Sequence, residues 1–537
     1  MLKPRISRGS LKKIPASFRA IISREVRSST TRSWKDSAAR ELLNIRCSLR
    51  LLRAIIAREF LHNLRNLRFM IGLVLCLIVT VACIIILSHD YRQELADYNH
   101  RVNLQDEFLS NYATRNRMFR TVPTQKPPER FRPLIIGMSG DETLKSFDDN
   151  PLPILFPSLD FLFIVTIIMS LLAILFSYDA ITGERQSGTL RLVIANSVPR
   201  TTILFGKFIG GAASLIIPFI LAILVGVLYI NLNPNIQWDG SAWVELALLT
   251  AASITFITLF YLLGLMVSTF SRYSAVSILN CLFLWVLLIL VIPNVCPYIS
   301  AQLRRVPSIR ETERQAEEID RASREVLGQR RKEVVNEFRG DYGGLFSKLE
   351  SLGFGKILDD EIGDKEKVEQ LAAVDPQFKT MVDAFRRELE QAQQKWQDTL
   401  RKEEDTLWGN LNTKAAAQTR LAKNLACISP LSDFVYVARD LTGTGLRSLE
   451  YFEHTKGEYG KRFWPYVTKK VQDAQKNDPK FTWDSFLDIS DRPRFVFKEE
   501  PLKYKLGEVL PYWGILGLFN VVFFVAAFAG FMRYDVR

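Results

Sequence analysis

A short polar segment between two long apolar runs holds the residues of this chain that are best suited to chemistry. Residues 177–207 read SYDAITGERQSGTLRLVIANSVPRTTILFGK. Glu184 and Arg185 can form charge-assisted contacts, while Gly188 permits a tight turn and Thr189 can cap a following helix. Charged groups this close to hydrocarbon must lie in water or against another protein. The segment therefore predicts a loop that a partner protein binds, although its residue types alone also fit a solvated loop with no partner.

The sequence contains none of the common motifs for ATP, ester or peptide hydrolysis. The phosphate-binding pattern G-x-x-x-x-G-K-[ST] does not occur, because neither Gly206-Lys207 nor Gly460-Lys461 has the required flanking residues. The patterns G-x-S-x-G and H-E-x-x-H do not occur either. The four histidines lack the spacing of a metal site. We therefore expect a chain that is not an enzyme and has no catalytic, cofactor or metal site of its own.

Apolar residues, 48% of the chain, gather in uninterrupted blocks. A helix needs about 20 apolar residues to cross a hydrocarbon core of roughly 30 Å. Six blocks approach this length, and Asp160 in the second is the one charged residue among them. The pattern predicts an all-α polytopic membrane protein with spans at 69–87, 154–176, 208–230, 247–270, 275–299 and 512–532.

Positive charge is concentrated before the first span. Residues 1–68 hold 17 Lys and Arg against four acidic residues, a net charge of +13 that equals the net charge of the whole chain. Such a basic arm favours a cytoplasmic position and contact with anionic membrane lipids. The loop 177–207 and the tail 533–537 are then also cytoplasmic, and 88–153 and 301–511 are extracytoplasmic.

Two alternatives for the basic arm follow from its composition. Nucleic-acid binding is not expected, because the arm has no groove-reading motif and few aromatic residues. Its first 40 residues are rich in Ser and Arg, which leaves an organellar transit peptide as an alternative.

The end of the basic arm, just before the first span, is amphipathic. An apolar stripe predicts a helix that lies in the membrane interface, although a continuous extension of the first span also fits. The third span begins with a small-x-x-x-small pattern, which predicts close helix packing. The stripe comprises Ile55, Ile56, Phe60, Leu64 and Leu67, and the small residues are Gly206, Gly210 and Gly211.

Together these features resemble the permease subunits of the type-2 exporter class of ATP-binding-cassette (ABC) transporters. The resemblance covers residues 50–300 and 505–537 and is carried by the interfacial helix, the six spans and the E-R-x-x-G-T-L segment. In that family this segment forms a coupling helix that docks on a separate ATPase subunit. The ATPase-coupling residues implied by the resemblance are Asp179, Glu184, Arg185, Gly188, Thr189, Leu190 and Arg200, with Lys207 completing the pattern.

The resemblance also implies cofactors, partners and a location. ATP and Mg would be held by the partner ATPase, and the permease would face a second copy or a homologous permease. The location implied is a bacterial inner membrane, with both termini in the cytoplasm.

The segment 301–511 departs most from a minimal member of that family, which has only a short connection there. Its highly charged sequence carries two apolar stripes at helical spacing, which predict a mostly helical domain with an antiparallel helix pair. Such a domain would bind an extracytoplasmic ligand or partner. The stripes comprise Ile319, Ala322, Val326, Val334 and Phe338 in the first helix, and Phe385, Leu389, Ala392, Trp396 and Leu400 in the second.

Sparse polar residues within the spans favour an apolar, amphipathic or bulky substrate. The preferred function is therefore the permease subunit of an ATP-driven ABC exporter of unknown substrate. Two alternatives stay open. The chain could be a mechanotransmission or anchoring subunit that acts on an extracytoplasmic partner without moving a solute, or it could be a membrane receptor.

Overall fold

The computed structural model is mostly helical in the part of the chain that it describes, and these residues form no strand. The described residues are 50–114, 123–137, 159–195, 198–234, 236, 238–353, 365–478 and 485–533. Most of the basic arm, parts of the predicted loop 88–153, the first residues of the second predicted span and most of the tail lie outside them. Within the described residues, six helices are long and apolar enough to cross a membrane, which confirms the predicted all-α polytopic fold.

The chain divides into two compact units. The membrane unit comprises Met1–Pro293 and Cys427–Arg537, and the hairpin unit comprises Asn294–Ala426. The predicted segment 301–511 is therefore split between the two. Its later part belongs with the spans because Phe434, Val437 and Leu441 are fully buried in the core that the spans form.

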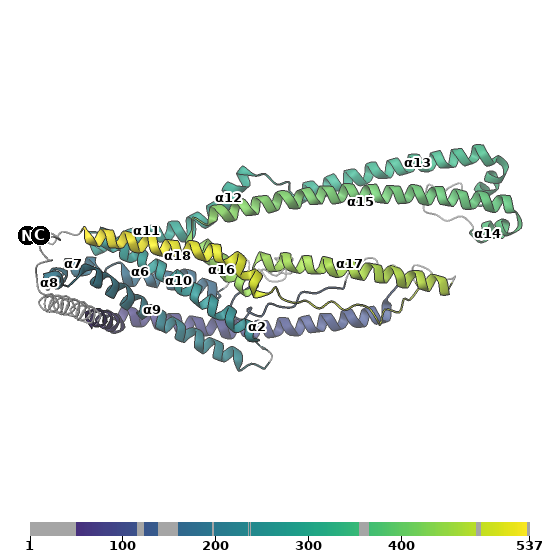
Figure 1. Cartoon of the computed structure of the whole chain (residues 1–537). Helices are drawn as coiled ribbons and strands as arrows, with labels where there is room; N and C mark the ends of the chain where they lie inside the picture. The colour runs from purple at the N-terminus through teal and green to yellow at the C-terminus, as the bar shows by residue number, and fades with distance from the viewer. Residues whose placement is uncertain are drawn as a thin grey trace, which may run out of the picture. The chain divides into compact units, whose positions relative to one another are not determined.

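Six spans make up most of the membrane unit (Figure 1). Two of them are built from consecutive α- and π-helical segments, and the sixth begins ten residues before the predicted span. In chain order the spans are α2 (Leu67–Tyr112), α5–η3–α6 (Phe161–Phe163, Ile164–Met169, Ser170–Ser177), α9 (Arg200–Asn231), α10 (Gly240–Phe270), α11–η4–α12 (Ser274–Trp285, Val286–Val291, Ile292–Leu303) and α18 (Leu502–Met532). From Asn294 onward, α12 belongs to the hairpin unit.

Local sequence signals set where several helices begin and end. Asp239 and Ser429 accept backbone N–H bonds at the starts of α10 and of α16 (Pro430–Thr442). Pro199 and Pro501 immediately precede α9 and α18. At the end of α16, Gly443 takes the left-handed conformation that glycine adopts most readily.

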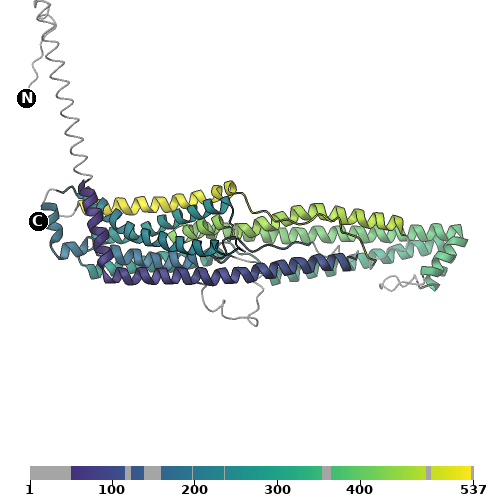
Figure 2. The same ribbon diagram turned by 90° about the horizontal axis from the view of Figure 1, so that it is seen from below.

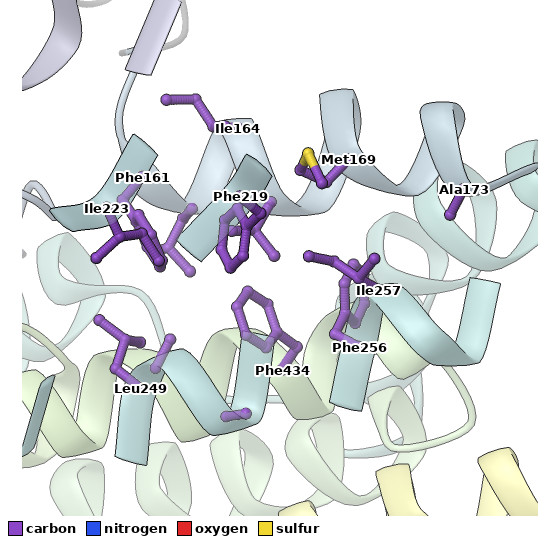
Figure 3. Packing of buried hydrophobic residues seen from close by; sticks show 14 of the residues in the cluster. Phe161, Ile164, Met169, Ala173, Phe219, Ile223, Leu249, Phe256, Ile257 and Phe434 are labelled. Atoms are coloured by element: carbon purple, nitrogen blue, oxygen red, sulfur yellow. The ribbon is translucent and has the colours of Figure 1, made fainter. Parts of the chain in front are cut away.

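The core of the membrane unit is centred on α10, which packs against α6, α16 and α18. Phe256 of α10 stacks on Phe434 of α16 with ring centroids 4.7 Å apart. Phe161 packs against Phe219 of α9 in the same cluster (Figure 3). Because lipid tails are as apolar as these side chains, close van der Waals packing holds such helices together in a membrane. The spans are thereby held as one packed body.

Beyond the first predicted span, α2 continues as a single helix to Tyr112, where a loop was predicted from residue 88. The last turns of α2 pack against α17 (Leu446–Asn477) and the segment after it. Leu109 and Ala113 are buried there with Tyr459 and Phe463. Charged residues on the exposed face made this part resemble a loop, whereas Leu109 and Ala113 pack against α17.

The hairpin unit contains the predicted antiparallel pair. Its two long helices are α13 (Ile309–Ser351) and α15 (Pro376–Ala426) (Figure 1). The short helix α14 (Lys365–Val374) lies between them along the chain. Phe338 packs edge-to-face on Phe385, which also contacts Phe346. Several stripe residues of both helices are therefore buried in one core.

Residues 50–65 form a helix that lies across the ends of the bundle helices and nearly perpendicular to α2 (Figure 2). Asn66 is not helical, so this helix is separate from α2 and does not extend it. We call it the interfacial helix. Ile55, Ile56 and Phe60 are half-buried as predicted, whereas Leu64 and Leu67 are exposed.

Candidate functional site

The predicted coupling segment forms two short helices joined by a turn, α7 (Thr182–Gln186) and α8 (Thr189–Ala195). Gly188 between them has a φ of +73°, and no atom lies within 4 Å of the position a Cβ would occupy. Its need for glycine is therefore conformational. The Thr189 hydroxyl donates to the Glu184 carbonyl, 3.4 Å away, so it ties α8 back to α7.

Two sets of hydrogen bonds hold α7 against α10 and the turn after it. The Ser268 hydroxyl accepts from the backbone N–H groups of Ile181 and Thr182, each at 3.1 Å. The Arg185 guanidinium donates to the Ser271 carbonyl at 2.9 Å. Both contacts engage the last turn of α10 or the residues that follow, so α7 is fixed to the C-terminal end of α10.

Glu184 points into the membrane unit. Its Oε1 lies 2.9 Å from Nζ of Lys207 on α9 and 3.8 Å from the guanidinium of Arg58 on the interfacial helix. Lys207 also lies 2.9 Å from Glu59 of the interfacial helix, and its side chain is only 4% exposed. One buried ammonium therefore joins α7, α9 and the interfacial helix.

Glycines on α9 allow the interfacial helix to reach this ammonium. A Cβ at Gly206 would lie 2.5 Å from Ile55, and one at Gly210 would lie 2.9 Å from the Ile56 carbonyl. Neither approach is possible with a larger residue in the same backbone position. The close packing predicted from the small-x-x-x-small pattern is confirmed, and the interfacial helix is its partner. At Gly211 the Tyr261 side chain of α10 approaches in the same way, since a Cβ there would lie 1.8 Å from its hydroxyl oxygen.

A polar cavity of about 270 Å³ lies between the interfacial helix, α7 and α9. Asp179, Glu184 and Thr189 line it from one side, and Lys207 and Glu59 from the other. The structure therefore brings three of the predicted coupling residues to one cavity. Its wall is formed partly by an element that is remote in sequence.

The other predicted coupling residues lie elsewhere. Leu190 is fully buried in a cluster with Ile181, Ile203 and Phe531, so it anchors α8. Arg200 at the start of α9 donates to the Met532 carbonyl at 2.7 Å. Both residues fasten the coupling segment to the spans and do not face outward.

The outward face of α7 and α8 consists of residues outside the predicted set. Gln186, Ser187, Arg191 and Leu192 are exposed, and Leu192 keeps 67% of its surface. An apolar side chain beside a cation on an exposed turn suits a protein contact. Helical spacing within 189–195 could have revealed this face, because Leu190 and Val193 occupy the opposite side.

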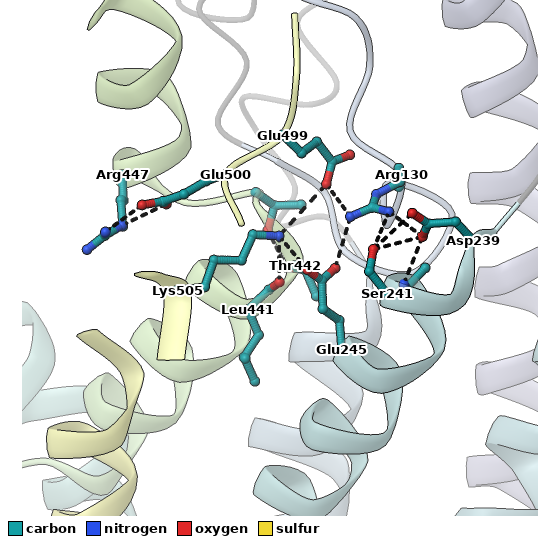
Figure 4. Close-up of polar contacts among 12 residues, drawn as sticks. Arg130, Asp239, Ser241, Glu245, Leu441, Thr442, Arg447, Glu499, Glu500 and Lys505 are labelled. Carbon is teal, nitrogen blue, oxygen red and sulfur yellow. Dashed lines mark hydrogen bonds and ion pairs between the residues drawn. The ribbon is translucent and has the colours of Figure 1, made fainter. Parts of the chain in front are cut away.

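A second group of charges lies at the other end of the bundle (Figure 4). Lys505 of α18 is 2.8 Å from Glu245 of α10, and their side chains are 3% and 1% exposed. Arg130 contacts Glu245, Asp239 and Glu499. Burial alone would lower the pKa of Arg130, but these carboxylates raise it above its ordinary value. No sequence pattern indicates this network, since its members are far apart along the chain.

Comparison with known proteins places these features in a family. A model of the ABC-2 family of transporter proteins matches residues 53–536. A probable ABC transporter permease protein NosY of Stutzerimonas stutzeri is 43% identical over 63 residues, which are 12% of this chain and 21% of that protein. The protein of the same description in Pseudomonas aeruginosa is 45% identical over 47 residues, 9% and 17% of the two chains. The chain thus matches about a fifth of the length of each curated relative.

Proposed function

Because this chain belongs to the ABC-2 family of transporter proteins and is a non-catalytic permease subunit, we propose that it couples ATP hydrolysis to export of a substrate. A separate ATPase subunit binds ATP and Mg and docks on α7 and α8. The membrane is a bacterial inner membrane, and the end of the bundle that carries α7 lies in the cytoplasm. The basic arm, with 13 net positive charges in residues 1–68, supports this orientation.

The observation that carries the proposal is the position of Lys207. A coupling element must be connected rigidly to the spans, so that a movement of the docked partner is transmitted to them. Lys207 joins α7 directly to α9 and to the interfacial helix through Glu184 and Glu59, each at 2.9 Å. A displacement of α7 therefore moves the ends of two further elements.

The exposed parts of the spans support contacts with lipids and with a second permease copy or a homologous permease. Leu279 and Phe283 of α11 and Leu518 of α18 are more than 60% exposed. In a membrane these side chains face acyl chains or another protein. A dimer around the transport path would cover part of this surface.

One observation favours a second candidate, mechanotransmission to an extracytoplasmic partner. Hydroxyl groups in the middle of α10 bond to carbonyls one turn earlier in the same helix, as seen for Thr250, Ser253 and Thr255. Polar groups satisfied in this way do not need a solute. The hairpin unit would then be the part that acts on the partner.

Reconstitution with the cognate ATPase tests the proposal. We expect the two proteins to co-purify, and we expect the permease to stimulate ATP hydrolysis. Accumulation of substrate in inside-out vesicles would favour export, whereas stimulated hydrolysis with no solute movement would favour mechanotransmission. A chain that binds no ATPase would contradict both and favour the membrane receptor.

A further inference from the structure

Two spans of the membrane unit contain π-helical segments. Residues Ile164–Met169 form η3 in the second span, and Val286–Val291 form η4 in the fifth. A π turn adds one residue to the helix, disturbs its hydrogen-bond ladder and often marks a functional position. Ser170 directly after η3 and Trp285 directly before η4 bond to each other, and Ser429 at the start of α16 bonds to Leu288 within η4.

The Leu288 carbonyl in η4 has neither of its usual intrahelical donors. The N–H of Ile292, four residues on, donates to Leu287 instead. The residue five positions on is Pro293, which has no N–H. The hydroxyl of Ser429, the N-cap residue of α16, donates to the Leu288 carbonyl at 2.5 Å. One side chain therefore satisfies the interrupted helix and joins it to α16.

This bond lies where the chain passes between the two units. The hairpin unit begins at Asn294, shortly after Leu288, and ends at Ala426, shortly before Ser429. Both connections to the hairpin unit therefore leave the membrane unit beside one hydrogen bond. A change at this bond acts on both connections at once.

Two further hydrogen bonds connect the helix before η4 to the second span, which leads to the coupling segment. Ser277 of α11 donates to the Tyr178 carbonyl at 2.7 Å, next to α7. Further along, Trp285 donates from its indole N–H to the Ser170 hydroxyl at 2.8 Å. The spacing along both helices is equal, about 12 Å at 1.5 Å per residue, so α6 and α11 are tied in register at two levels.

The ties end where the π-helical segments begin. Ser170 is the first residue of α6, directly after η3, and Trp285 is the last residue of α11, directly before η4. We call the paired stretches Ser170–Tyr178 and Ser277–Trp285, which these two bonds hold in register, the α6–α11 strut. Beyond Trp285 the regular ladder gives way to η4, whose free carbonyl is held by Ser429.

We propose that η4 and the Ser429–Leu288 bond form a hinge through which the α6–α11 strut moves the hairpin unit. Trp285, Ser170 and Ser429 are its positioning residues. The strut transmits a displacement of α7 to η4. The hinge converts this displacement into a movement of both connections to the hairpin unit. The inference rests on the proposed function for the source of the displacement, and it supplies the mechanical route that the mechanotransmission candidate needs.

Distance measurements on the full chain test the hinge without any ATPase. Spin labels on non-canonical amino acids at the exposed positions 398 and 454 report on the two units and leave Cys427 intact. Ser429→Ala removes the bond, so we expect a broader distance distribution than in the unaltered chain. Ser429→Thr keeps the hydroxyl and should give the distribution of the unaltered chain. An unchanged distribution in Ser429→Ala, or equal broadening in both variants, would overturn the hinge.

A second measurement follows the relay in the complex with the ATPase. Trp285→Phe keeps the ring and removes the N–H, so ATP hydrolysis should persist while the nucleotide-dependent shift in distance is lost. The matched control is Trp513→Phe, which removes an indole bond to Thr255 between α18 and α10 and should leave the shift intact. A full shift in Trp285→Phe would overturn the relay. If the unaltered chain binds no ATPase, the proposed function fails, and the first measurement still decides the hinge.

Discussion

Glu184 of α7 and Lys207 of α9 form an ion pair of 2.9 Å in which the lysine side chain is 4% exposed. The pair forms the inner half of the proposed coupling site, and Glu59 of the interfacial helix binds the same ammonium. Removing one member of such an ion pair is costly in folding free energy, because the remaining charge is left without a partner. This cost makes the site sensitive to single substitutions.

Replacing Lys207 by Met should disable coupling and destabilise the membrane unit, because Glu59 and Glu184 lose the cation between them. The loss should be smaller than the roughly 3–5 kcal/mol of a fully buried pair, since the two carboxylates are only partly buried. Thermal unfolding in detergent and stimulated ATP hydrolysis measure the two effects. The control is Lys456→Met, which breaks the exposed pair with Glu453 and should cost at most about 1 kcal/mol. Equal stability of the two variants would contradict the role of Lys207.

Opposite faces of the coupling segment should respond differently to substitution. Glu184→Lys places a cation beside Lys207 and Arg58, so stimulated hydrolysis should be lost even where the ATPase still binds. Arg191→Glu alters the exposed face of α8, so it should weaken ATPase binding and leave thermal stability unchanged. Pull-down and hydrolysis assays on the same preparations separate these effects. Full activity and full ATPase association in Glu184→Lys would refute its role.

The buried charges at the other end of the bundle should be structural. Glu245→Gln leaves Lys505 and Arg130 short of one carboxylate, so we expect a loss of roughly 3–5 kcal/mol of stability with ATPase binding retained. Lys461→Met breaks an exposed pair with Glu458 and serves as the matched control. A stable Glu245→Gln variant that fails to bind the ATPase would assign the network a different role.

Removal of the hairpin unit should leave the six spans folded only if the cut respects its boundaries. A short flexible linker in place of 304–420 keeps α16 and its buried residues, so the spans should fold and bind the ATPase while the physiological activity is lost. A linker in place of 301–511 also removes Phe434 and Leu441 from the core and should yield unfolded protein. Size-exclusion profiles distinguish the two. A well-folded 301–511 replacement would show that α16 is dispensable.

The sequence predicted the features that depend on local composition. Apolar blocks revealed the six spans, and the spacing of Gly206 and Gly210 revealed a close helix approach, because each signal lies within one helix. It also predicted the interfacial helix from one stripe of apolar residues. The identity of the helix that approaches these glycines needed the fold.

Features that depend on tertiary contacts were missed. Glu184 reads as a surface acid, and only the fold places Lys207 and Arg58 beside it. The charged end of α2 reads as a loop, because its apolar partner Phe463 lies far away in the sequence. Segment α16 reads as part of an outer domain, since its short apolar run does not reveal that Phe434 stacks on Phe256 of α10.

Photo-crosslinking in intact membranes tests most directly whether α8 receives the ATPase. A crosslinking amino acid replaces exposed Arg191 on α8 in one sample and exposed Asp398 on α15 in another, and mass spectrometry identifies the joined proteins. We expect an ABC ATPase subunit to be joined at position 191 and none at position 398. An ATPase joined at position 398, or no ATPase at position 191 while the chain co-purifies with one, would contradict the assignment of α7 and α8 as the coupling site.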